Sequence, residues 1–145
     1  MGVEPRIQLR VHSLTNPDLQ DKYIVPLSDG EHTYGYAIPH PQGVYSLPWR
    51  PDNEFVEYFS EPRQYLSIED ESCGVPALKF TEDYCQKGFY PNNDRFLTAN
   101  GSTNWYACRT PSLEITKTYP VIALYSGDAP SCGCEKIQIW YNRVA

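Results

Sequence analysis

Ile7-Gln8-Leu9-Arg10-Val11-His12 alternates apolar and polar side chains, and this stretch decides the class of fold. Successive side chains of a β-strand point to opposite faces, so the alternation predicts a strand with one buried face. The same pattern returns near the other end of the chain, in Ile137-Gln138-Ile139-Trp140-Tyr141-Asn142. Both ends of the chain are therefore expected to be amphipathic strands.

Short apolar segments follow one another between these two strands, at 23–25, 34–38, 44–47, 55–59, 65–68, 78–80, 96–98, 105–108 and 119–125. Turn-forming groups such as Asp29-Gly30 and Pro91-Asn92-Asn93 separate them. This spacing predicts an all-β fold with little helix, either an antiparallel β-sandwich or a closed β-barrel of about ten short strands. A short helix fits only around 15–22, where Asn16-Pro17 resembles a helix start.

The length and charge of the chain limit its domain number and the partners that it can have. Its 145 residues predict a single domain, 1–145, with a core of its own. A net charge of −6 offers no basic footprint, so we expect no nucleic-acid partner. No apolar run is long enough to span a membrane. We also expect the protein to be a monomer. The opening segment 1–5 lacks the features of a secretory signal, and we interpret the chain as a mature protein whose signal was removed.

All five cysteines lie in the second half of the chain, at Cys73, Cys85, Cys108, Cys132 and Cys134. A zinc site needs two close cysteine pairs, or a cysteine pair with a histidine pair, and only Cys132 and Cys134 are close together. We therefore predict no metal site, two disulfides and one remaining thiol. Five cysteines allow about fifteen arrangements of two bridges, and the sequence alone does not choose among them. We favour Cys73–Cys85 and Cys108 with Cys134 or Cys132. Disulfides indicate an oxidising compartment, which favours a secreted, extracellular or cell-wall protein.

Three tryptophans are candidate binding residues, Trp49, Trp105 and Trp140, because an exposed indole can stack on a sugar ring or anchor a protein partner. Packing in the core is the competing interpretation for each of them. Asn100-Gly101-Ser102 is a candidate glycosylation site at Asn100.

Catalytic motifs are absent from the sequence: no G-x-S-x-G elbow and no cysteine-protease signature occurs. His12, His32 and His40 could serve as acid or base in a ribonuclease, and the many carboxylates could serve a glycoside hydrolase. None lies in a recognisable motif. We therefore expect no enzyme and no cofactor, and a small secreted hydrolase or ribonuclease is a further alternative.

Most of the chain resembles a group of small secreted fungal proteins. The similarity lies in 77–81, in Asn104-Trp105-Tyr106-Ala107-Cys108, in 119–125 and in the closing Cys132-x-Cys134. The group includes phialide-type cell-wall proteins, domains similar to the C-terminal part of a yeast ubiquitin-like-binding protein, and hypersensitive-response-inducing elicitors of plant-pathogenic fungi. The resemblance implies that Cys108 pairs with a late cysteine, and no catalytic residue carries over.

The resemblance implies a cell-wall-associated protein, or a virulence effector or elicitor that triggers plant cell death. Such a protein acts by surface recognition, and its partner is a plant or cell-wall protein or glycan. The alternative is a carbohydrate-binding module that uses exposed Trp or Tyr side chains.

Overall fold

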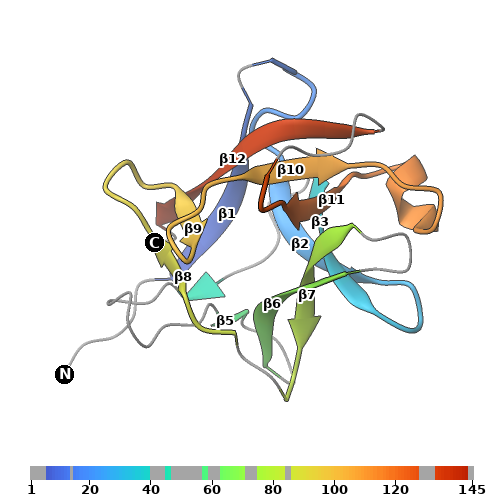
Figure 1. The fold of residues 1–145 in the computed structure, drawn as a ribbon, viewed down its shortest axis with the longest axis horizontal. Coiled ribbons are helices and arrows are strands. Elements are labelled where there is room, and N and C mark those ends of the chain that lie inside the picture. The colour runs from blue at the N-terminus through green and yellow to red at the C-terminus, as the bar shows by residue number, and fades with distance from the viewer. Residues whose placement is uncertain are drawn as a thin grey trace.

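The structure, a computed structural model, describes residues 6–13, 15–39, 45–46, 57–58, 63–70, 75–83, 86–127 and 133–143. These residues form strands and one 3-10 helix, η1 (Glu114–Lys117), as Figure 1 shows. The strands are β1 (Arg6–His12), β2 (Tyr23–Ser28), β3 (Thr33–Ile38), β4 (Tyr45–Ser46), β5 (Glu57–Tyr58), β6 (Gln64–Asp70), β7 (Pro76–Thr81), β8 (Phe89–Pro91), β9 (Leu97–Ala99), β10 (Trp105–Cys108), β11 (Val121–Leu124) and β12 (Cys134–Arg143). The all-β prediction is confirmed.

Six of the strands close into a ring in which every neighbouring pair is antiparallel. The order is β1-β2-β3-β11-β10-β12, and β12 pairs again with β1. The ring is not a regular barrel, because β7, β6, β5 and β4 extend the same sheet beyond β3 and β11. That extension returns to the start of β1, where Ile7 lies opposite Tyr45. A separate hairpin of β8 and β9 lies against β12, where Phe96 bridges to Trp140.

The alternation of β1 places its apolar side chains inside the fold. Ile7, Leu9 and Val11 are at most 1% exposed, whereas the polar side chains between them are half-buried. Ile137 and Ile139 of β12 are buried in the same way. These side chains join one large core cluster with members from most strands and from the β8–β9 hairpin. The burial of this apolar area, at about 25 cal/mol per Å², is the main force that holds the sheet closed.

A second cluster covers the outer face of part of the ring. It contains Tyr34 and Tyr36 of β3, Val121 of β11 and Leu113 of the segment before η1. The strands of this region are therefore buried on both faces, which explains why 34–38 and 119–125 are continuously apolar rather than alternating.

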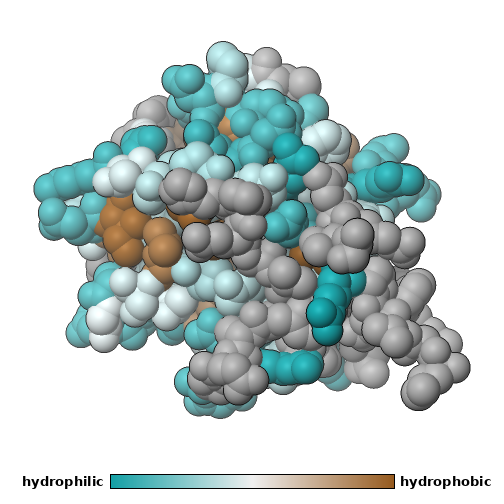
Figure 2. Space-filling view, turned by 180° about the vertical axis from the view of Figure 1, so that it is seen from behind, coloured by the Kyte–Doolittle hydropathy of each residue, from teal (hydrophilic) through white to brown (hydrophobic). Residues whose placement is uncertain are grey.

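Figure 2 shows that the coloured rear surface is mostly hydrophilic and carries one compact hydrophobic area.

The segment 15–22 forms a turn-rich loop between β1 and β2, so the expected short helix is wrong. The Asn16 side-chain oxygen accepts a hydrogen bond from the backbone N–H of Asp18, at 3.0 Å. This local bond holds the chain in a turn instead of starting a helix. Asp21 then adopts a left-handed conformation, with φ of 66°, which ends the turn and leads into β2.

Tyr45 makes the stability of the fold sensitive to alkaline pH. Its hydroxyl donates to the Ile24 carbonyl at 2.8 Å, and burial, with a smaller contribution from Tyr58, raises the pKa of its phenol well above the usual value. Above about pH 10 the unfolded chain loses this proton first, so the free energy of unfolding declines as pH rises. We expect a decline of up to about 1.4 kcal/mol per pH unit, measured by urea denaturation between pH 8 and 11. Tyr45→Phe should reduce this slope, and an equal slope in both proteins would contradict the assignment.

Candidate functional site

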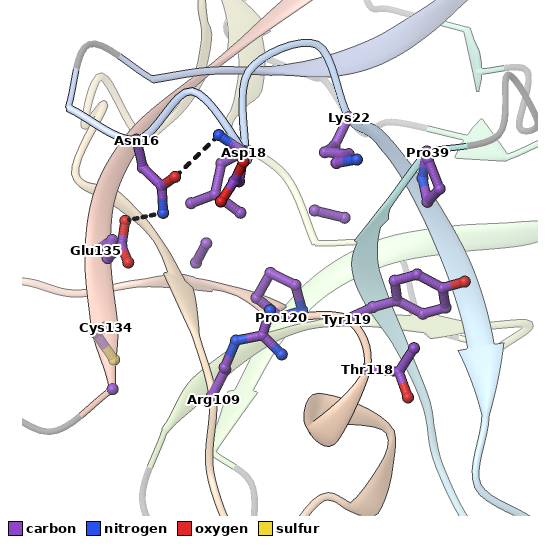
Figure 3. A pocket seen from close by; sticks show the side chains of 14 residues that line it. Asn16, Asp18, Lys22, Pro39, Arg109, Thr118, Tyr119, Pro120, Cys134 and Glu135 are labelled. Carbon is purple, nitrogen blue, oxygen red and sulfur yellow. Dashed lines mark hydrogen bonds between the residues drawn. The ribbon is translucent and has the colours of Figure 1, made fainter.

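One end of the six-stranded ring is open and forms a cavity of about 520 Å³. Five segments meet there: the β1–β2 loop, the end of β3, the end of β10, the loop before β11, and the start of β12. Figure 3 shows the side chains that these segments contribute around the opening, which we call the ring mouth. The mouth of a closed sheet is a frequent place for ligand sites, and its volume lies within the range of about 300–1,000 Å³ that such sites occupy.

The floor of the ring mouth is apolar and is formed by small side chains. Ala37 of β3 and Ala107 of β10 are at most 3% exposed and belong to the large core cluster. Leu19 of the β1–β2 loop and Pro120 complete this floor. Because alanine fills much less space than the leucines and isoleucines elsewhere in the core, the ring remains hollow at this end.

A hydrogen-bonded side chain connects two edges of the ring mouth. The Asn16 amide donates to Oε2 of Glu135 at 2.8 Å, while its oxygen accepts from Asp18 N–H. Figure 3 shows both bonds at the upper left of the opening. The bond to Glu135 ties the β1–β2 loop to the start of β12, and the bond from Asp18 orients the Asn16 side chain within the loop.

Two cationic side chains, Lys22 and Arg109, also line the ring mouth. Arg109 extends from the lower edge toward the centre of the opening (Figure 3), and its Nη1 donates to the Thr116 carbonyl at 2.7 Å. Elsewhere Arg10 and Asp21 form an ion pair of 3.0 Å. Within the described parts of the chain, no ion pair of this kind involves Lys22 or Arg109. Both are therefore available to an incoming acidic group.

The predicted bond from Cys108 to a late cysteine is confirmed, and its partner is Cys134. The two residues lie directly opposite each other on β10 and β12, with Cα atoms 4.0 Å apart. Cys108 is fully buried, and Cys134 lines the ring mouth. The disulfide therefore anchors the wall of the cavity. Cys73, Cys85 and Cys132 lie outside the described residues, so the Cys73–Cys85 bond stays a prediction.

Trp105 is a core residue, so its interpretation as a binding platform is wrong. Its side chain is 0% exposed, stacks on Phe89 and donates from Nε1 to the Leu97 carbonyl at 2.8 Å. Trp105 points into the six-stranded ring because the side chains of β10 alternate between its two faces. Its indole is large enough to fill the space inside that ring opposite the β8–β9 hairpin. Trp49 lies outside the described residues.

Trp140 lies on the outward face of β12 and is half-buried. It is packed with Arg10, whose guanidinium lies 5.9 Å from the ring centroid, and with His12 at 5.4 Å between centroids. Its Nε1 is buried without a hydrogen-bond partner among the described residues. The binding role predicted for Trp140 stays a prediction.

The remaining candidates lie apart from one another. His12 is beside Trp140, His32 lies in the turn between β2 and β3, and His40 is outside the described residues. Asn100 and Gly101 form an exposed two-residue turn with positive φ values of 52° and 83°, closed by hydrogen bonds between Ala99 and Ser102. This is the geometry that Asn-Gly favours in tight hairpins. Asn100 is therefore exposed at a turn, and its glycosylation stays a prediction.

No residue of the ring mouth was predicted from the sequence as a ligand-binding residue. Lys22 and Arg109 carry no motif, and Ala37 and Ala107 are indistinguishable in sequence from any alanine in a strand. One segment of the ring mouth could have been suspected from the sequence, the loop 15–22, because it is polar and lies between two strands. No local pattern shows that it meets the end of β10 and the start of β12.

Comparisons with protein-family models, with curated proteins and with solved structures find no match to this chain. In the part of the chain that the structure describes, there is also no helix with the length and apolar character needed to cross a membrane.

Proposed function

We propose that this protein is an extracellular recognition protein that binds its partner at the ring mouth and carries out no catalysis. The observation that supports the proposal is the mouth itself, an apolar floor surrounded by polar and charged side chains from strand ends and from the loops between them. Sites of this form hold a ligand by packing on the floor and orient it with a few polar groups at the edge. The Cys108–Cys134 disulfide, which suits an oxidising compartment, supports the extracellular location.

The biological role in this proposal is that of a fungal cell-wall-associated protein or an effector that triggers plant defence. Its partner is a component of the plant surface or of the cell wall. The carbohydrate-binding alternative on Trp140 has weaker support, because Arg10 and His12 already pack against that indole and the Phe96 ring packs against His12.

A single bulky substitution at the edge of the ring mouth tests the proposal. Thr118 is exposed and lines the mouth, whereas its neighbour Lys117 is exposed and does not. We expect Thr118→Trp to block the opening and to reduce binding to isolated cell-wall material at least tenfold. Plant cell death after leaf infiltration should decrease in parallel. Binding is measured by sedimentation with the wall material.

Lys117→Trp is the matched control, because it adds the same side chain one residue away. It should bind and act like the wild type, and so should Trp140→Ala. Equal binding by the wild type and Thr118→Trp would refute the ring mouth as the recognition site. A loss confined to Trp140→Ala would favour the carbohydrate-binding module instead.

A further inference from the structure

Charged groups of both signs face the ring mouth from different edges. In Figure 3, Arg109 lies at the lower edge of the opening and Lys22 at the upper right, whereas Asp18 and Glu135 lie at the upper left. The Glu135 carboxylate is already held by the amide of Asn16, at 2.8 Å. The two cations have no carboxylate partner among the described residues. A ligand that fits these edges therefore needs an acidic group on one side and hydrogen-bond donors on the other.

The cationic side matches a carboxylate best. A guanidinium is a planar fork of five N–H donors that fits the two oxygens of a carboxylate, and the Lys22 ammonium adds a point charge from the upper edge of the same opening. The Thr116 carbonyl occupies one nitrogen of Arg109 and so fixes the direction in which the fork points. The remaining guanidinium donors have no partner in the described parts of the chain, so they can bind the acid.

The acidic side matches hydroxyl groups. An ionised carboxylate accepts hydrogen bonds and donates none, so Asp18 and Glu135 can bind the O–H groups of a ligand without carrying a proton themselves. Charge-assisted bonds of this kind are stronger than those between neutral groups. At the right of the opening in Figure 3, the half-buried ring of Tyr119 and the exposed ring of Pro39 offer apolar surfaces that can pack on the C–H face of a sugar.

We propose that the ring mouth binds a uronic acid residue, a sugar ring that carries both a carboxylate and hydroxyl groups. Its carboxylate lies against Arg109 and Lys22, and its hydroxyls bind Asp18 and Glu135. This inference rests on the proposed function, since it specifies the ligand of the same site.

The test compares two ligands that differ only in the acidic group, a trimer of galacturonic acid and a trimer of galactose, by isothermal titration calorimetry. We expect the acidic trimer to bind at least tenfold more tightly, and its affinity to fall as salt screens the charges. Arg109→Gln should weaken its binding by about 10- to 100-fold, the effect of losing a charge-assisted hydrogen bond. Lys87→Gln removes one exposed positive charge outside the mouth and should change the affinity by less than twofold.

Each other outcome overturns the inference in a distinguishable way. Equal affinity for both trimers, blocked by Thr118→Trp, would retain the ring mouth as a binding site and rule out uronate selectivity. Competition by acetate or inorganic phosphate as strong as that by galacturonic acid would show a general anion site. If neither trimer binds, the uronate inference is wrong, and the cell-wall assay with Thr118→Trp decides the proposed function independently.

Discussion

Trp105→Ala is expected to lower the free energy of unfolding by about 3–5 kcal/mol, the cost of deleting a buried aromatic side chain from a packed core. Trp105 is 0% exposed, its ring centroid lies 6.4 Å from that of Phe89, and its Nε1 donates to the Leu97 carbonyl. The substitution leaves a cavity in the ring and removes the donor from a buried carbonyl. Because single domains are typically stable by only about 5–15 kcal/mol, the variant should be close to unfolded. Urea denaturation followed by far-UV circular dichroism measures the change.

Two variants separate the contribution of the hydrogen bond to Leu97 from the contribution of the buried indole. Trp105→Phe keeps an aromatic ring and loses the hydrogen bond to Leu97, so we expect a smaller loss of about 1–3 kcal/mol. Trp140→Ala removes an indole of the same size from the half-buried outer face of β12 and should cost less than Trp105→Ala. Equal losses at Trp105 and Trp140 would contradict the assignment of Trp105 to the core.

Removing the Cys108–Cys134 disulfide is expected to lower the free energy of unfolding by about 3.5 kcal/mol. The bond closes a loop with a sequence separation of 26, and the estimate is the chain entropy that such a loop removes from the unfolded state. The double variant Cys108→Ala with Cys134→Ser should show this loss in urea denaturation without reductant. Because Cys134 also lines the ring mouth, the double variant should also bind its ligand with lower affinity.

Non-reducing peptide mapping is the control for this prediction. It should recover one peptide pair that joins Cys108 to Cys134 in the wild type and lose it in the double variant. A pair that joins Cys108 to Cys132, or a stability loss below about 1 kcal/mol, would contradict the assigned bond.

Strand positions were predictable wherever a single local pattern decides the structure. The segment 105–108 is β10 without any change of bounds, and the alternation of 7–12 and 137–142 identified β1 and β12. β8 was missed because Phe89–Pro91 is short and ends in a proline that was assigned to a turn. Loop 15–22 was misjudged because Asn16-Pro17 fits both a helix start and an Asx turn. The hydrogen bond from Asp18 N–H to the Asn16 side chain decides between them.

Residue chemistry alone could not separate core from surface among the tryptophans. Trp105 and Trp140 both lie in strands that alternate, and burial depends on which face of each strand turns inward. β10 turns Trp105 inward against the β8–β9 hairpin, whereas β12 turns Ile137 and Ile139 inward and therefore leaves Trp140 outside. The partner strands make this choice, and they lie far away in the sequence.

The amino-acid sequence by itself determined that this chain is an antiparallel β protein, and it favoured, without deciding, a disulfide between Cys108 and one of the two late cysteines. Period-two alternation and turn residues are local, so they can be read without knowledge of distant partners. Only the tertiary structure decided that Cys134 is the partner and that six strands close into a ring. The same closure brings Lys22, Arg109 and Glu135 to one opening. Long-range pairing creates the ring mouth, because its walls come from segments more than 100 residues apart in the chain.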